Sequence, residues 1–305
     1  MLCITSSAGV FMTDFLQAVG DGVFIGLVYA LLGLCIVIIF KASETFNFAA
    51  GEFLVIGAFV FYVFFFDLGL PMILALPLGL ATAGLVGGLV EWFTIKPLLG
   101  RSPLSMTMVT LGLAFLLRSI VQFIWGSESY SFFMELPDIT VEAGELLYIS
   151  DPIWAGLFSV VTFVLVLLFL FRTRWGLAIR AVSEDQAKSM AFGINARFIL
   201  LIIWAISSVC IAVAGIMISN FGALSVTSVG IGLRSIPVVL IGGMDSIGGA
   251  LVAGIIVGVC ESLAGAYIEP LGMVGFKEVA PYFLMLLVLF IRPYGLFGTV
   301  RIERV

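Results

Sequence analysis

The chain has 305 residues, of which 62% are hydrophobic and only 11% are charged, and its mean hydropathy is +1.25. A soluble domain carries about 25% charged residues, so this composition excludes a water-soluble globular protein, which needs more polar groups to cover its surface. The formal net charge is -5 and there is no histidine. A histidine-based proton relay and a histidine-ligated metal site are therefore excluded.

Apolar segments follow one another along the whole chain, and most approach the length of about 20 residues that crosses a bilayer core. They cover residues 15–40, 52–66, 71–95, 103–125, 152–171, 198–219, about 233–244, 247–264 and about 279–291. The second segment and the last three are short or are interrupted by Gly and Pro. The sequence therefore predicts an all-α polytopic membrane protein with about eight to ten transmembrane helices. No polar stretch is long enough for a soluble domain, so residues 1–305 are predicted to form a single transmembrane domain.

Basic residues are concentrated in one long polar loop, residues 172–197. The loop carries Arg172, Arg174, Arg180, Lys188 and Arg197. Lys and Arg favour cytoplasmic loops, so we place this loop inside. The alternation of spans then places on the same side Lys41, Lys96, Arg101, Arg292, Arg301 and Arg304. The exceptions are Arg118, Arg234 and Lys277.

The loop at residues 126–151 has the opposite character, with several acids and no Lys or Arg. Its acids are Glu128, Glu135, Asp138, Glu142, Glu145 and Asp151. We therefore expect an inner-membrane protein with a periplasmic acidic loop, an outer N-terminus and a cytoplasmic C-terminus. The N-terminal segment has no basic n-region, so a cleaved signal peptide is not expected, and Met1 and Met12 both remain open as start sites.

The middle of the basic loop is predicted to be a short helix. Ser183 and Gln186 fit a capping box at its start, Lys188 follows Glu184 by four residues, and Gly193 can end it. This helix would present Ala187, Met190, Ala191 and Phe192. It is either the surface on which a cytoplasmic motor pushes or an ordinary amphipathic helix at the membrane interface, and the spacing alone favours neither.

Two segments combine small residues with an acid, at residues 47–53 and 242–249. Glycine-interrupted segments in both halves of a transporter indicate broken helices near the solute path. Glu52 would lie at membrane depth, where a carboxylate is costly unless it is paired or hydrated. For residues 242–249, a tight turn between two helices is slightly favoured. The two segments are too different to establish an internal repeat.

Several other polar groups lie within or beside apolar segments. Arg118 is about sixteen residues into its span, and we expect it to pair with an acid such as Glu261 or to reach the outer interface near Trp125; structural pairing is favoured over solute contact. Glu91 and Trp92 are interpreted as interface anchors. The cysteines Cys3, Cys35, Cys210 and Cys260 show no paired spacing, so packing is expected and a disulfide is not.

No phosphate-binding Gly-x-x-x-x-Gly-Lys loop is present, so this chain is not expected to bind ATP in that manner. If transport is driven by ATP, another subunit binds the nucleotide, and no cofactor is expected here. A secondary transporter driven by an ion gradient, with Glu52 and Glu261 as intramembrane acids, remains an alternative. A membrane-embedded enzyme is disfavoured because the acids are scattered, and no residue is predicted to perform chemistry.

Several motifs, in order along nearly the whole chain, resemble the H-type permease subunit of the branched-chain amino-acid ABC transporters. They lie at residues 26–31, 47–53, 91–97, 176–181, 184–185, 193–195 and 242–250. Ala50 stands where the family usually has His, and Asp245 stands where it often has Gly. The resemblance implies a type II ABC importer permease fold. It also implies an M-type second permease subunit, two P-loop ATPase subunits and a periplasmic solute-binding protein, with membrane lipid around the chain and no nucleic acid.

The resemblance also implies a solute and two sets of functional residues. The solute would be leucine, isoleucine or valine, although related permeases serve urea, short amides and aromatic acids. The residues expected to couple the chain to the ATPase are Arg180, Glu184, Asp185, Lys188, Gly193 and Asn195. The residues expected to line the translocation pathway are Asn47, Gly51, Glu52, Gly243, Asp245 and Ser246.

Overall fold

The computed structural model describes residues 2–98, 100–131, 134, 136, 137, 139, 141–143, 146–148 and 150–299. For residues 2–11, 141–143, 146, 147 and 221 it describes the backbone alone. The longer helices are α1 (Leu2–Ser43), α2 (Ala50–Tyr62), α3 (Met72–Val90), α4 (Pro103–Trp125), α5 (Ser150–Arg172), α6 (Arg174–Glu184), α8 (Ala196–Phe221), α11 (Ile247–Leu263) and α12 (Phe276–Ile291). The shorter ones are η1 (Val63–Asp67), η2 (Glu91–Ile95), η3 (Lys96–Leu98), α7 (Gln186–Ala191), η4 (Val226–Ser228), α9 (Val229–Leu233), α10 (Ser235–Gly242), η5 (Ala264–Ile268) and η6 (Glu269–Leu271). Glu135, Asp138, Glu145, Arg301 and Arg304 lie outside the described residues.

The prediction of an all-α polytopic protein is confirmed. Within the described residues, 7 helices are long and apolar enough to cross a membrane, and a shorter apolar stretch covers Val226–Gly242. The 16-residue α12 is a further apolar helix. The described residues also contain two short antiparallel strands in the acidic loop, β1 (Val141–Ala143) and β2 (Leu146–Tyr148).

The span expected at 233–244 has a different form. Its helix, α10, has only 8 residues, and it follows η4 and the 5-residue α9 rather than continuing a long span. Glycines at 230 and 232 weaken helix formation here, and Arg234 stands between α9 and α10. This segment is therefore a broken helix.

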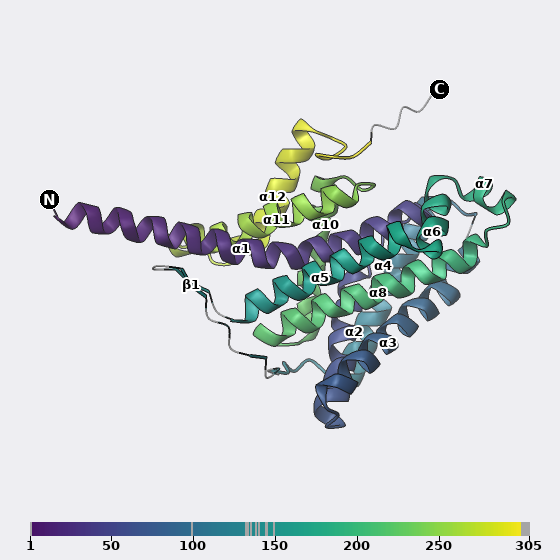
Figure 1. Ribbon diagram of the computed structural model, residues 1–305, viewed down its shortest axis with the longest axis horizontal. Coiled ribbons are helices and arrows are strands. Elements are labelled where there is room, and N and C mark those ends of the chain that lie inside the picture. Colours follow the sequence, from purple (N-terminus) through teal and green to yellow (C-terminus); the bar gives the residue numbers. More distant parts are fainter. Residues whose placement is uncertain are drawn as a thin grey trace.

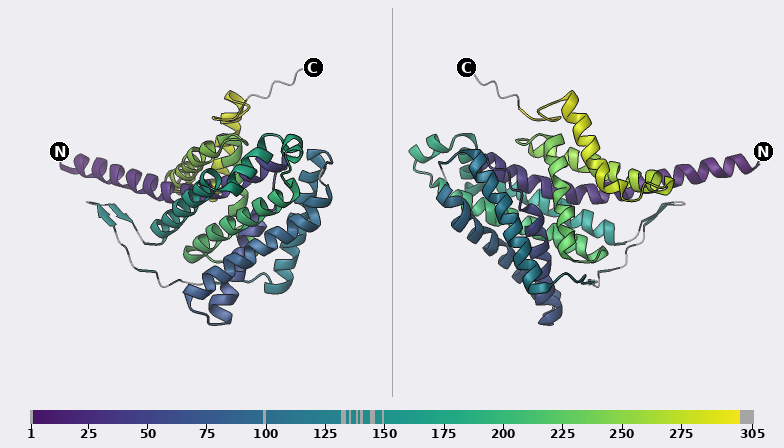
Figure 2. Two further views of the ribbon diagram at one scale, coloured as in Figure 1. Left: turned by 45° about the vertical axis from the view of Figure 1, so that its right-hand side comes forward. Right: turned by 180° about the vertical axis from the view of Figure 1, so that it is seen from behind.

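Helix α1 runs through the molecule, with α10, α11 and α12 on one side and α2, α3, α5 and α8 on the other (Figures 1 and 2). Its contact with α11 depends on four residues that we call the glycine seam: Gly22, Gly26, Gly254 and Gly258. A Cβ atom added at Gly254 would lie 2.6 Å from the Cα of Ala30, and one added at Gly22 would lie 2.6 Å from the Cα of Val259. Small residues thus bring the two backbones together, as is common between membrane helices.

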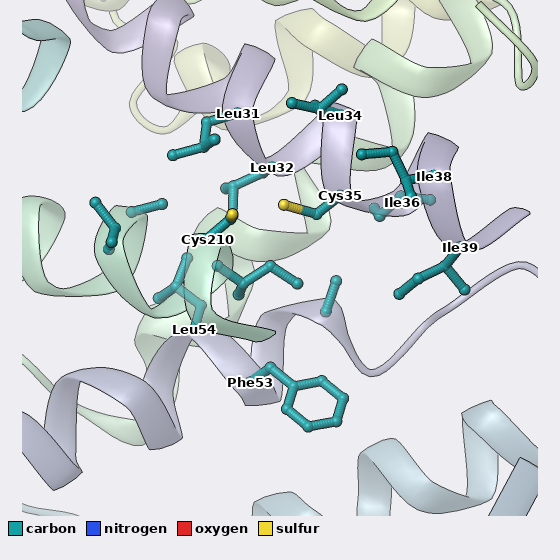
Figure 3. Close-up of a cluster of buried hydrophobic side chains, with 14 of the residues drawn as sticks. Leu31, Leu32, Leu34, Cys35, Ile36, Ile38, Ile39, Phe53, Leu54 and Cys210 are labelled. Atoms are coloured by element: carbon teal, nitrogen blue, oxygen red, sulfur yellow. The ribbon is translucent and has the colours of Figure 1, made fainter. Parts of the chain in front are cut away.

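Helix α8 packs in the same manner against α2 and α3. A Cβ atom added at Gly57 would lie 2.6 Å from the Cα of Ala212, and one added at Gly87 would lie 2.8 Å from the carbonyl oxygen of Trp204. Cys35 and Cys210 point toward each other in the core between α1 and α8 (Figure 3). Both are buried and are free thiols, as expected of packing residues.

The basic loop and the acidic loop lie at opposite ends of the molecule, as α7 and β1 show in Figure 1. At the first end, Lys41, Arg101 and Glu184 share the wall of one cleft of about 500 Å³. At the other end, the Asn220 side chain donates to Asp151 at 3.3 Å. The structure thus separates the two loops as predicted, while the compartment that each one faces stays a prediction.

Candidate functional site

The basic loop folds as two helices, α6 and α7, rather than one. Ser183 was expected to cap a helix, but α6 continues through it to Glu184, and the capping residue is Asp185, whose side chain accepts from the Lys188 N–H at 2.9 Å. Lys188 forms its ion pair with Asp185 at 2.9 Å and not with the expected Glu184. The capping-box prediction was wrong because α6, capped by Thr173 at its own start, extends farther than the sequence pattern indicated.

The end of the loop follows the prediction more closely. Gly193 follows α7 with φ of 84°, a backbone conformation that favours glycine. Asn195 caps α8 by accepting from the Phe198 N–H at 3.2 Å. The residues between present large apolar groups to the surface, since Met190 is 54% exposed and Phe192 is 86% exposed. These two side chains lie outside the membrane spans, where exposed apolar area indicates a contact with another molecule.

The remaining coupling residues are also at the surface of this loop. Arg180 is exposed, and its guanidinium lies 5.1 Å from the ring centroid of Phe171. Glu184 and Asp185 line the cleft shared with Lys41 and Arg101. The pKa of Asp185 lies below its usual value because its carboxylate accepts two hydrogen bonds from Lys188. The bond from the Lys188 N–H has the larger effect, and the bond from the Lys188 ammonium has the smaller one. The structure brings these residues together, and their coupling role stays a prediction.

The residues before α2 form a tightly held entry to that helix. Thr110 on α4 donates to the Phe46 carbonyl at 2.9 Å, which fixes the entry against α4. Asn47 is buried, and its Oδ1 accepts from the Ala49 N–H at 3.0 Å. Its amide nitrogen, Nδ2, has no hydrogen-bond partner among the described residues.

Glu52, in the first turn of α2, pairs with Arg118. The Arg118 Nη2 donates to Glu52 Oε1 at 2.8 Å, with the Glu52 side chain 1% exposed and that of Arg118 39% exposed. The sequence left open a reach to the outer interface near Trp125 or a pair with an acid such as Glu261; Arg118 does pair with an acid, but this acid is Glu52 because α4 packs on α2. Glu52 Oε2 and Arg118 Nε are both buried and have no partner in the described part of the chain.

The broken helix that meets the α2 entry is α9, which precedes segment 242–249 in the chain. A Cβ atom added at Gly51 would lie 2.7 Å from the carbonyl oxygen of Val229, and one added at Gly232 would lie 2.9 Å from the nitrogen of Gly51. Two interrupted helices thus cross in direct backbone contact. Gly232 was missed by the sequence reasoning, although the pair of glycines at 230 and 232 in an apolar run is a signal that could have identified it.

Segment 242–249 forms a tight turn between α10 and α11, the interpretation that the sequence slightly favoured. Gly243 has φ of 100°, and Ser246 caps α11 by accepting from the Gly249 N–H at 3.0 Å. Asp245 accepts from the backbone N–H and the hydroxyl of Thr299. Gly243, Asp245 and Ser246 therefore hold a turn and the C-terminal segment, and a role of theirs in the pathway stays a prediction.

A second buried ion pair joins Arg234 to Glu261. Arg234 Nη1 donates to Glu261 Oε1 at 2.5 Å and to the Tyr29 hydroxyl at 3.1 Å, and that hydroxyl donates to Glu261 Oε2 at 2.7 Å. Glu278 adds a longer contact to Arg234 at 3.5 Å. This cluster ties the broken helix to α1, α11 and α12.

Glu91 is not the interface anchor that the sequence suggested. Its side chain is fully buried at the end of α3, and neither carboxylate oxygen has a partner among the described residues. The adjacent Trp92 is 51% exposed, and the Lys96 ammonium lies 2.8 Å from its ring centroid. Trp92 therefore fits the anchor role, whereas Glu91 faces the protein interior.

Comparisons with known proteins identify the family of this chain. Residues 19–291 match the protein family described as branched-chain amino acid transport system / permease component. The permease protein LivH of the high-affinity branched-chain amino acid transport system of Escherichia coli K12 is 28% identical over 95% of this chain and 98% of its own length. The corresponding BraD permease protein of Pseudomonas aeruginosa is 26% identical over the same shares. The solved structure of PsaBC from Streptococcus pneumoniae in complex with Fab aligns with 96% of this chain and 97% of its own, with 15% identity and a TM-score of 0.49.

The family match covers all of the chain from the first half of α1 to the end of α12, including the two interrupted helices and the exposed α6–α7 loop. The chain therefore belongs to the family of permease components of branched-chain amino acid transport systems.

Proposed function

We propose that the chain is one permease subunit of an ATP-driven importer of branched-chain amino acids. A second permease subunit of the M type would complete the membrane channel. Two separate P-loop ATPase subunits would bind ATP on the cytoplasmic side, and a periplasmic binding protein would deliver leucine, isoleucine or valine from outside. The N-terminus would then be periplasmic and the C-terminus cytoplasmic, as the distribution of Lys and Arg indicates.

The observation that carries the proposal is the α6–α7 loop. It projects beyond the membrane spans, exposes Met190 and Phe192, and lies beside a cleft with charges of both signs. A rigid helical loop with an apolar contact surface can transmit a movement of the ATPase to the spans that it joins, α5 and α8. Such a movement shifts the access of the pathway only if the contacts differ between the two states.

The crossing of α2 and α9 supports a pathway beside it. Discontinuous helices that meet near the middle of a transporter often mark its solute route. Here the α2 entry and α9 touch at Gly51 and Gly232, close in sequence to Glu52 and Arg234. Asn47, Gly51 and Glu52 are proposed to border this route.

Two of the relatives are named as permease proteins of high-affinity branched-chain amino acid transport systems, which favours that solute class over urea, short amides or aromatic acids. An ion-gradient-driven secondary transporter is the rival from another class. It would use Glu52 and Glu261, but both form ion pairs with arginines here, and a paired carboxylate is a poor carrier for a proton.

The first test is a mild-detergent pull-down of the tagged protein from native membranes, followed by uptake of labelled leucine in proteoliposomes with the binding protein. We expect a P-loop ATPase and a second multispanning permease to co-purify, and uptake to require ATP. Recovery of this chain alone, with uptake that survives ATP depletion and collapses with the ion gradient, would establish the secondary transporter instead.

The coupling role of the loop has its own test. In the Gly193→Val variant, a β-branched residue is forced into a backbone conformation with φ of 84°, which costs on the order of 1–3 kcal/mol and distorts the end of α7. We expect the complex to assemble and hydrolyse ATP while leucine uptake falls several-fold. Asn tolerates this conformation better than Val, so Gly193→Asn is the control and should keep most of the uptake. Unchanged uptake in Gly193→Val would contradict the coupling role.

A further inference from the structure

The polar groups around the α2 entry have hydrogen-bonding capacity that the protein itself does not use. Glu52 Oε2 can accept, and Arg118 Nε and Asn47 Nδ2 can donate, yet all three atoms are buried and have no partner in the described part of the chain. Buried polar atoms almost always have partners, because an unpaired one costs about 1–3 kcal/mol. Two of these atoms belong to the ion pair between α2 and α4, and the third lies in the segment just before α2. A ligand that enters between these helices would use this free capacity.

The exposure of Arg118 indicates where that ligand would come from. Its side chain is 39% exposed on a face of α4, well inside a membrane-spanning helix. A guanidinium in contact with lipid tails would be strongly unfavourable, so this face must be covered by water or by another polypeptide. The exposed residues of α4 beside it are of both kinds, polar at Ser119 and Gln122 and apolar at Phe115 and Leu116. Arg118 thus reaches the surface of this subunit, and a second permease subunit packed on this face would enclose a pathway beside it.

The unused atoms also define the chemistry of the ligand. A carboxylate acceptor suits a cationic donor such as an ammonium group, and an arginine N–H or an amide N–H suits an anionic carboxylate. Hydrogen bonds between charged groups are roughly twice as strong as neutral ones. A zwitterionic α-amino acid carries both charged groups on one carbon, and a urea or a short amide carries neither.

We propose that Glu52, Arg118 and Asn47 form a site in the translocation pathway that binds the charged ends of a zwitterionic α-amino acid. Glu52 Oε2 accepts from the ammonium group, and Arg118 Nε and Asn47 Nδ2 donate to the carboxylate. The side chain of the amino acid makes no contact with these three residues, so the site is selective for the zwitterion and indifferent to which amino acid carries it. The proposal rests on the importer function proposed above.

The test measures ATP-driven uptake of labelled leucine by the full complex with its binding protein in proteoliposomes. Glu52→Gln keeps the size of the side chain and removes its charge, and it should lower uptake about tenfold or more. A purely structural ion pair would be rescued by neutralising both partners. The double variant Glu52→Gln with Arg118→Gln should therefore assemble with the wild-type yield of purified complex, and still show the tenfold loss of uptake. Glu278→Gln, which removes a carboxylate from the other arginine pair, should leave uptake unchanged.

The outcomes separate this site from the function on which it rests. Restoration of leucine uptake to within about twofold of wild type in the double variant would overturn the site and leave the importer intact. If the double variant does not assemble, Arg118→Lys decides, because it keeps the charge and lacks the Nε–H donor; an unchanged KM for leucine would then overturn the site. ATP-driven uptake of urea or a short amide, with none of leucine, would overturn both the site and the proposed solute.

Discussion

The two buried ion pairs of this protein are built differently. In the Arg234–Glu261 cluster, both carboxylate oxygens of Glu261 have donors, and the Tyr29 hydroxyl both accepts and donates. In the Glu52–Arg118 pair, a single hydrogen bond joins the two side chains, and one atom on each is left buried without a partner in the described structure. Arg234 and Glu261 are 27 residues apart in the sequence, whereas Glu52 and Arg118 are 66 residues apart.

This difference teaches which pair holds the fold and which is available for a ligand. A fully bonded network in a medium of low dielectric rigidifies the elements that it connects, while a partly bonded one is costly to the fold. The first cluster connects four helices and leaves nothing to offer a solute. The second offers one unused donor and one unused acceptor, and its arginine is 39% exposed on α4.

The largest effect on stability is expected from breaking the complete cluster. Replacing Glu261 with Ala leaves the Arg234 guanidinium with the neutral Tyr29 hydroxyl and the longer contact to Glu278 as its partners. Loss of one partner from a buried pair costs about 3–5 kcal/mol, so the thermal midpoint of the purified complex in detergent should fall sharply. The comparison is Glu278→Ala, which loses the exposed end of the cluster and should cost under about 1 kcal/mol. Equal shifts for the two variants would contradict the structural role of Glu261.

A smaller change converts the complete cluster into an incomplete one. Tyr29→Phe removes the hydroxyl that donates to Glu261 Oε2 at 2.7 Å, so this oxygen becomes unpartnered like Glu52 Oε2. We expect a loss of about 1–3 kcal/mol, measured as a lower thermal midpoint, with leucine uptake per assembled complex unchanged. A variant that kept its stability but lost uptake would place Tyr29 in the pathway and remove the distinction between the two pairs.

The incomplete pair should show the reverse pattern. The double variant with Glu52→Gln and Arg118→Gln removes two charges that are only partly compensated in the fold. Replacing a buried ion pair with neutral groups is often close to neutral for stability, so we expect the thermal midpoint to move by less than that of Tyr29→Phe. A fall as large as that of Glu261→Ala would show that this pair, too, is mainly structural.

The exposed Asp185–Lys188 pair provides the smallest expected effect and a reference for both buried pairs. Because the pKa of Asp185 is lowered in the folded protein, its contribution is present above its ordinary pKa and is lost only as the pH falls through the lowered value. Thermal midpoints of wild type and Asp185→Asn should therefore run parallel from about pH 5 to 8, and Asn preserves the cap. Divergence of the two curves within this range would contradict the surface character of the pair.

Sequence reasoning identified the spans and the loops but not the contacts between distant helices. Long apolar runs such as Pro103–Trp125 were placed correctly because hydrophobic length is a local property. Gly193 was also predicted correctly as a helix-end residue, since caps depend on nearby sequence. The partner of Arg118 was not, because two acids at similar depth, Glu52 and Glu261, were equally compatible with it until the packing of α4 on α2 was known.

The broken helix shows a second limit of the same kind. An apolar run with glycines at 230, 232, 242 and 243 is equally compatible with a span that ends in a turn and with two shorter helices. The close approach of Gly51 to α9 decides between them, and it is a tertiary contact without a local signal. Likewise, the length of α6 determined that Asp185 and not Ser183 begins α7.

The glycine seam between α1 and α11 has a mechanical consequence. With the two backbones in contact at Gly22, Gly26, Gly254 and Gly258, neither helix can slide or roll along the other without a collision of main-chain atoms. The two helices must then move as one rigid body, and the turns attached to their ends move with them. A rearrangement that opens one side of the membrane and closes the other must therefore occur in the helices that pack through larger side chains. These helices would move relative to the rigid α1–α11 pair.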